Sequence, residues 1–148
     1  MPTIETKAFT RVRNFSQPDC SEVETQPIDI EFPAVTFAVN DMIRLVELPA
    51  GVMLQDYAFV FPDIDSGGPT FAFSFGVMNA AGTDLATVYA AGLTAGQSNA
   101  IVRAPNSDCA TDAVNTALVR RLGIKVTTAA TTYSGSGKVG QVLVSLRG

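Results

Sequence analysis

The side chains that most often carry out catalysis are scarce in this sequence. Its 148 residues include no histidine, which removes the commonest general base, the usual hydrolase triads and the most frequent zinc ligand. Cys109 would need a different base to act as a nucleophile, and the carboxylate of its neighbour Asp108 disfavours the thiolate form. The acidic residues are scattered through expected turns and the N-terminal segment rather than set out as a facing pair. We therefore expect that the protein is not an enzyme.

Two loops share part of their pattern with ligand-binding motifs. Residues 63–68 (DIDSGG) alternate aspartates ahead of glycine, as the start of a calcium loop does, but the bidentate acid that closes such a loop is missing. Residues 135–137 (GSG) lack the lysine and the spacing of a phosphate-binding loop. Turn formation explains both stretches better. We expect neither a metal nor a cofactor.

Charge and cysteine usage restrict the class of partner. The net charge of −4 disfavours a general nucleic-acid binder, which needs an excess of basic residues. No apolar run approaches the roughly 18 residues that span a bilayer, and residues 1–15 lack the apolar core of a signal peptide. Cys20 and Cys109 are expected to be free thiols, with a bridge between them as the alternative. The sequence predicts synthesis in the cytoplasm and neither nucleic acid nor membrane as a partner.

The proportion of charged residues is low. It is 16%, against about 25% in an average soluble domain. The surface must therefore consist of small, uncharged residues or be covered by a neighbouring chain. The second possibility indicates a subunit of an assembly, because little charge remains to keep exposed apolar surfaces apart.

From residue 36 onward, apolar side chains alternate with small or polar ones, which is typical of strands with one buried face. The clearest case is residues 71–77, where Phe71, Phe73 and Phe75 share a face that we expect to lie in the core. Residues 134–137 are expected to form the turn of a hairpin between the last two strands. Further strands are expected at residues 43–48, 57–61, 98–103, 124–128 and 142–146.

Roughly eight short strands without a long helix predict an all-β, antiparallel β-sandwich. Jelly-roll and immunoglobulin-like topologies are both open at this point. We place the sandwich in residues 36–148. Residues 1–35, which are rich in proline and lack regular periodicity, are expected to form an extended N-terminal arm.

The expected arm carries basic residues near its tip and only acidic ones from residue 16 to residue 31. Such an arm suits docking on two oppositely charged patches, although a solvated terminus is the simpler alternative. Phe9, Arg11, Arg13 and Phe15 are our candidates for anchoring it to a partner chain.

Two adjacent guanidinium groups, those of Arg120 and Arg121, form a second candidate contact. Guanidinium groups bind carboxylates of a partner in a bidentate way. Solvated surface charge is the alternative explanation for both residues.

Several segments together resemble the head decoration, or cement, proteins of tailed bacteriophages. They are residues 40–52 (NDMIRLVELPAGV), 63–67 (DIDSG), 71–76 (FAFSFG), 122–130 (LGIKVTTAA) and 138–144 (KVGQVLV). The resemblance covers about residues 36–147 and leaves out the expected arm.

The resemblance implies a jelly-roll-like sandwich bound to the outer surface of the phage head. There it would stabilise contacts between major capsid protein subunits, as a homodimer or homotrimer, after synthesis in the bacterial cytoplasm. A head-fibre, tail, or receptor- or carbohydrate-binding module of the particle is the alternative. A carbohydrate-binding module predicts exposed aromatic rings, which separates it from the first hypothesis.

Overall fold

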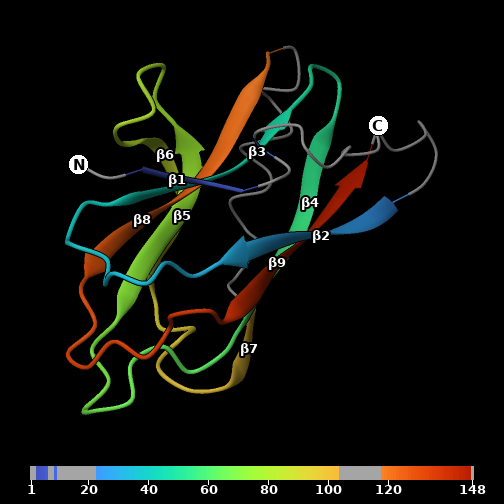
Figure 1. Cartoon of the computed structure of the whole chain (residues 1–148). Coiled ribbons are helices and arrows are strands. Elements are labelled where there is room, and N and C mark those ends of the chain that lie inside the picture. Colours follow the sequence, from blue (N-terminus) through green and yellow to red (C-terminus); the bar gives the residue numbers. More distant parts are fainter. Residues whose placement is uncertain (1–2, 7–8, 10–22, 104–117, 148) are drawn as a thin grey trace.

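The computed structural model describes residues 3–6, 9, 23–103 and 118–147. These residues form nine strands in two facing sheets and no helix (Figure 1). The predicted all-β sandwich is thereby confirmed. The strands are β1 (Thr3–Glu5), β2 (Val23–Glu31), β3 (Met42–Leu48), β4 (Met53–Phe61), β5 (Ala72–Met78), β6 (Leu85–Leu93), β7 (Ala100–Arg103), β8 (Arg120–Thr128) and β9 (Val139–Arg147).

The strand order is that of a jelly roll. The five-stranded sheet runs β1-β3-β8-β5-β6 and the four-stranded sheet runs β2-β9-β4-β7. Antiparallel pairs join β2 to β9, β3 to β8, β4 to β7 and β5 to β6, as if one long hairpin had been rolled up. Rolling then adds the pairs β4/β9 and β5/β8. This order distinguishes the jelly roll from the immunoglobulin-like alternative.

Two parts of the predicted arm are strands of the sandwich. β2 pairs with β9 over its whole length, from Val23 opposite Arg147 to Glu31 opposite Val139. β1 pairs in parallel with β3 at the edge of the other sheet. The expected boundary at residue 35 therefore does not separate arm from sandwich. Pro27 interrupted the sequence pattern, but β2 is an edge strand, where proline is tolerated.

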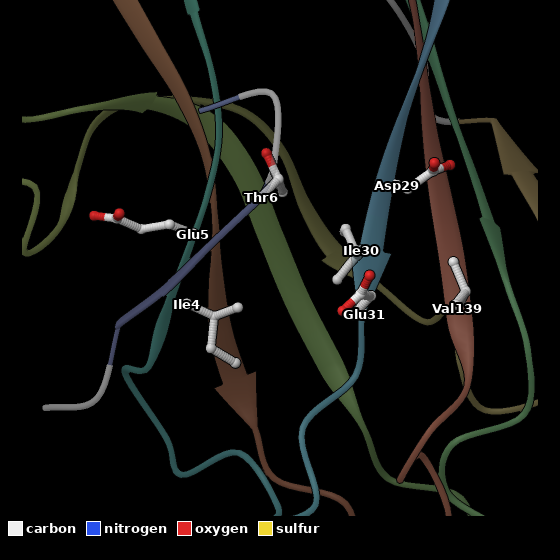
Figure 2. Close-up of a pocket in the computed structure, with 7 residues that line it drawn as sticks. All are labelled: Ile4, Glu5, Thr6, Asp29, Ile30, Glu31 and Val139. Carbon is white, nitrogen blue, oxygen red and sulfur yellow. The ribbon is translucent and has the colours of Figure 1, made fainter. Parts of the chain in front are cut away.

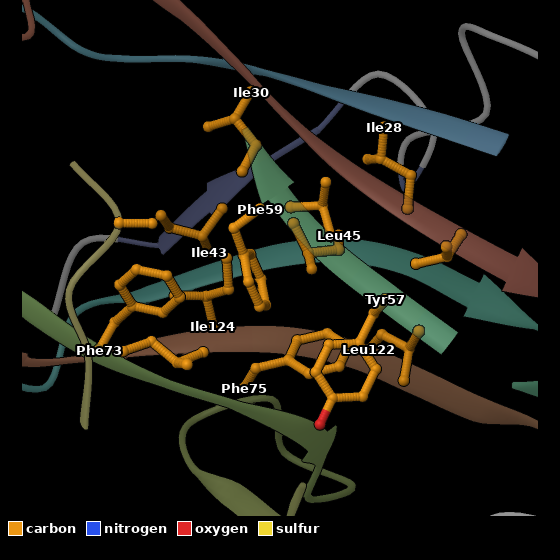
Figure 3. Packing of buried hydrophobic residues seen from close by; sticks show 14 of the residues in the cluster. Ile28, Ile30, Ile43, Leu45, Tyr57, Phe59, Phe73, Phe75, Leu122 and Ile124 are labelled. Carbon is orange, nitrogen blue, oxygen red and sulfur yellow. The ribbon is translucent and has the colours of Figure 1, made fainter. Parts of the chain in front are cut away.

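The core lies between the two sheets and is unusually aromatic (Figure 3). Phe71, Phe73 and Phe75 are buried, which confirms the predicted apolar face of β5. From the opposite sheet, the ring of Phe59 meets Phe73 and Phe75 edge-on, with centroids 5.2 and 5.4 Å away. Contacts of this geometry add to the stabilisation from area burial alone. Rings that alternate along β4 and β5 therefore meet at the centre of the contact between the two sheets.

Every connection between consecutive strands except that from β5 to β6 crosses from one sheet to the other. Residues 49–52 link β3 to β4, and the turn is closed by a hydrogen bond from Val52 N to Pro49 O at 3.3 Å, with Gly51 at φ 88°. Residues 129–138 link β8 to β9, which lie in different sheets. The prediction of a hairpin at residues 134–137 was therefore wrong. A local turn does form there, with Lys138 N bonded to Gly135 O at 2.9 Å, but it returns the chain to the other sheet.

Candidate functional site

Within the described residues, no group of three or more cysteine, aspartate or glutamate side chains is placed to hold a metal ion. Nor do those residues include a helix that could cross a membrane. The features of the described surface that can serve binding are its strand edges, a cleft, and the two outer faces of the sandwich.

Asp65, in the loop that resembles part of a calcium motif, is a structural carboxylate. Its side chain is buried, and Oδ2 accepts hydrogen bonds from the backbone N–H groups of Thr70 and Phe71 at 2.7 and 3.0 Å. Oδ1 accepts one from Thr132 N at 2.9 Å. Both oxygens thus face donors, which is the opposite of what a cation requires. Asp65 ties the loop after β4 to the loop after β8.

The same contacts set the acidity of Asp65. Burial raises the pKa of this carboxyl, but hydrogen bonds donated by the backbone of Thr132, Thr70, Phe71 and Thr131 lower it by more. The net pKa lies below its ordinary value of 3.8. The carboxylate is therefore ionised at neutral pH and serves as a multiple acceptor.

Tyr133 makes a second link between loops. Its hydroxyl donates to the carbonyl oxygen of Pro33 at 2.7 Å, which joins the β8–β9 loop to the β2–β3 loop. Burial raises the pKa of Tyr133 to about 12. The hydroxyl therefore stays protonated, and so remains a donor, throughout the neutral range.

The N-terminal residues that the structure describes are held on their own sandwich by Arg44. The guanidinium Nη1 lies 2.7 Å from Glu5 Oε1, and its central carbon lies 5.7 Å from the centre of the Phe9 ring. Thr6 adds a backbone bond to Arg44 O at 3.0 Å and a side-chain bond to Leu45 O. Phe9, a predicted partner contact, therefore lies against Arg44 of the same chain.

Replacing Arg44 with alanine is expected to loosen this N-terminal segment. The change removes a partly exposed ion pair and a cation–π contact, together worth about 1 kcal/mol. Hydrogen exchange at residues 3–6 should become faster while the rest of the sandwich stays protected. Arg121→Ala, which removes a comparable ion pair from the same sheet, is the control. Equal exchange at residues 3–6 in the two variants would contradict the role of Arg44.

A cleft separates the edge of one sheet from the edge of the other (Figure 2). It has a volume of about 420 Å³ and lies between β1 and β2, the outermost strands on that side. Three of its lining side chains are carboxylates, which disfavours an anionic ligand. Its lining consists of Ile4, Glu5, Thr6, Asp29, Ile30, Glu31 and Val139.

The two predicted arginine contacts differ in position. Arg120 is only 5% exposed and donates a hydrogen bond to the carbonyl oxygen of Val52, at the turn between the sheets. Its guanidinium is thus part of its own fold and not presented to a partner. Arg121 is exposed on the outer face of β8, where Nε lies 3.2 Å from Glu47 Oε2. Of this pair, Arg121 alone can reach another chain.

The other predicted contacts, Arg11, Arg13 and Phe15, lie outside the described residues, as do Cys20 and Cys109. The sequence did not single out Arg44, although it organises the N-terminal segment. The sequence feature that could have indicated its role is the irregular alternation of β3, where the pairing register shifts between Arg44 and Val46. A β-bulge of this kind changes the direction in which a side chain points.

Aromatic side chains in the described part of the chain do not form an exposed platform. All are buried except Phe9 and Tyr133, which are partly buried and occupied by contacts with Arg44 and Pro33. A carbohydrate-binding surface needs exposed rings. This distribution does not favour the carbohydrate-binding alternative.

Comparison with solved structures finds the same fold in phage particles. A chain in the capsid of Ralstonia phage GP4 matches with a TM-score of 0.79 and 26% sequence identity, over 99% of each chain. This protein is similar to a phage capsid chain along its whole length. A chain in the capsid asymmetric unit of cyanophage Pam1 shares the fold at a TM-score of 0.54 and 19% identity, over 90% of this chain and 91% of that one. No protein-family model and no curated protein matches the sequence.

Proposed function

We propose that this chain is a virion structural protein that decorates the head of a tailed phage. It binds the outer surface of the shell and stabilises contacts between major capsid protein subunits. The observation that carries the proposal is the match to the GP4 capsid chain over 99% of both chains. A match of that extent includes the edges and loops of the jelly roll as well as its core.

The physical character of the chain supports this proposal. A jelly roll whose two sheets share an aromatic core is a rigid body, and a rigid body loses little entropy when it binds. Many copies on a symmetric shell turn weak individual contacts into firm attachment. The low proportion of charged residues, 16%, agrees with a surface that is covered in the assembled particle.

Binding to undecorated heads tests the proposal. Purified protein added to heads that lack it should co-sediment with them, and a reconstruction should show it outside the shell. The decorated heads should also withstand a higher temperature before releasing DNA. Protein found only at a tail or fibre would support the alternative assignment, and protein that does not bind the particle would contradict both.

The predicted anchor in the N-terminal segment is tested on the full-length chain. Arg11→Glu combined with Arg13→Glu should lower head occupancy, and higher salt should lower the occupancy of the unaltered protein in the same way. Arg120 is excluded from this comparison because its guanidinium supports its own fold. Unchanged occupancy of the double variant would remove these two residues from the contact.

A further inference from the structure

Charge is distributed unevenly over the described surface of the sandwich. Three ion pairs with N–O distances of 2.7–3.2 Å lie on the five-stranded sheet and its β5–β6 hairpin. They join Arg44 to Glu5, Lys125 to Asp84 and Arg121 to Glu47. The cleft between β1 and β2 is lined by three carboxylates. Surfaces of both kinds are typical of parts of a protein that face water.

The four loops at one end of the sandwich differ from these surfaces (Figure 1). We call this surface the loop end, and it consists of residues 32–41, 62–71, 94–99 and 129–138. Four residues in these loops are charged, and none of the four is exposed. They are Asp41, Asp63, Asp65 and Lys138. The exposed residues are all uncharged, and Val35 is 74% exposed. Depletion of charged residues is the compositional mark of the centre of a protein–protein interface.

Hydrogen bonds between the loops hold the loop end in one arrangement. Ile64 N donates to Gly96 O at 2.8 Å, which joins the β4–β5 loop to the β6–β7 loop. Ile64 O accepts from Ser134 N of the β8–β9 loop at 2.9 Å. The Tyr133 hydroxyl then joins that loop to Pro33 of the β2–β3 loop. All four loops are thus connected, and a surface that is fixed before binding loses little conformational entropy when it binds.

An apolar hollow borders the loop end. It has a volume of about 360 Å³, and Pro62 and Asn99 of the loop end belong to its lining. Ile101 and Val139 also line it and are 69% and 55% exposed. Glu31, which is opposite Val139 in the pairing of β2 with β9, places a charge at the rim. A hollow lined by apolar side chains accepts an apolar side chain from an opposing surface, and such contacts supply much of the binding energy of an interface.

The area of the loop end favours a shell over a second copy of this chain as the partner. With sheets about 10 Å apart and strands about 4.8 Å apart, the end of a sandwich with its outer side chains measures roughly 20 Å by 20 Å. Two partners would then bury about 800 Å² together, which is less than the roughly 1,200–2,000 Å² of a stable interface. A pair of chains joined only by this end would be weak. A subunit that holds a particle through further contacts gains the missing affinity from them.

We propose, resting on the function proposed above, that the loop end is the surface that this chain turns toward the outside of the capsid shell. The hollow beside it receives an apolar side chain of a shell subunit. The partner surface is uncharged where it meets the four loops, because a charge there would be buried without a partner. The ion pairs of the five-stranded sheet then remain in water.

Two variants of the full-length protein test this docking surface on undecorated heads. Val35→Glu changes the loops and Ile101→Glu changes the hollow. Each places a charge where the shell would bury it, so the apparent Kd for heads should rise at least about tenfold. The matched control is Val88→Glu, which adds the same charge at a 48% exposed site on β6, outside the loop end, and should bind as the unaltered protein does. Circular dichroism verifies that all three variants are folded.

The outcomes separate the docking surface from the proposed function. If the unaltered protein binds heads, a smaller rise in Val35→Glu would overturn the assignment of the loops, and a smaller rise in Ile101→Glu that of the hollow. An equal loss in Val88→Glu would also overturn the assignment. Loss of self-association without loss of head binding would assign the loop end to a second copy instead. Absence of head binding by the unaltered protein would contradict the proposed function itself.

A reconstruction of decorated heads provides a test that needs no variant. The loop end should lie against the shell, with the outer face of the five-stranded sheet in solvent. A chain bound with the loop end in solvent would overturn the proposed docking surface and leave the decorating role intact.

Discussion

Replacing Asp65 with alanine should lower the free energy of unfolding by about 3–5 kcal/mol. The carboxylate accepts backbone hydrogen bonds from Thr70, Phe71 and Thr132, and the change leaves these donors without an acceptor. It also disconnects the loop after β4 from the loop after β8. Chemical denaturation followed by circular dichroism measures the loss, and a variant within about 1 kcal/mol of the unaltered protein would contradict the role of Asp65.

The contribution of Asp65 should depend on pH. Because its folded-state pKa is lowered from 3.8, the carboxylate stabilises the fold above that value, and the stabilisation is lost as pH falls through the folded-state pKa. The stability difference between the unaltered protein and Asp65→Asn should therefore be largest near neutral pH and shrink below about pH 4. Asp29→Asn, at a partly exposed site whose Oδ1 accepts from Gln141, is the control. If the stability difference between the unaltered protein and Asp65→Asn grew as the pH fell, the proposed role of the ionised carboxylate would be contradicted.

Phe59→Ala should cost a similar amount, about 3–5 kcal/mol, through a different mechanism. The ring is fully buried and contacts the rings of Tyr57, Phe61, Phe73 and Phe75, with centroids 5.2–6.0 Å away. Its removal leaves a cavity at the centre of the contact between the sheets. The melting temperature should fall by more than ten degrees at this chain length.

Two comparisons identify the cause of that loss. Phe59→Leu keeps most of the apolar volume and should cost clearly less than Phe59→Ala. Val88→Ala, at a site on β6 that is 48% exposed, should change stability by no more than about 0.5 kcal/mol. Equal losses in Phe59→Ala and Val88→Ala would show that the aromatic cluster does not carry the stability of the sandwich.

The two variants also bear on a role in a particle. Phe59→Ala weakens the contact between the two sheets and so affects the sandwich as a whole. Asp65 instead fixes loops at one end of the sandwich. If those loops contact the shell, Asp65→Ala should reduce head occupancy under conditions in which the variant is still folded.

The main parts of the fold could be predicted from local pattern. Alternation of apolar and polar residues follows directly from the two-residue repeat of a strand, so the buried face of β5 was predictable. The short strand expected at residues 98–103 is confirmed as β7 (Ala100–Arg103). β6 was not predicted, because its alanines and glycine weaken the contrast between its two faces. β2 was obscured by Pro27, although Ile28 and Ile30 alternate with acids in the expected way.

The candidate binding features were less predictable. Arg120 and Arg121 are adjacent in sequence, yet one supports a turn inside its own fold and the other is exposed. Asp65 lies in a loop that shares part of a calcium motif, but its carboxylate faces two N–H donors of its own loop and one from the distant β8–β9 loop.

The sequence by itself determined that reactive side chains are few, beginning with the absence of histidine, and that strands with one apolar face dominate the chain. Only the tertiary structure decided which strands pair and that residues 23–31 form an edge of one sheet. The physical reason is that side-chain alternation is a local property of the backbone. Strand pairing is instead set by contacts between segments such as β2 and β9, which are more than a hundred residues apart.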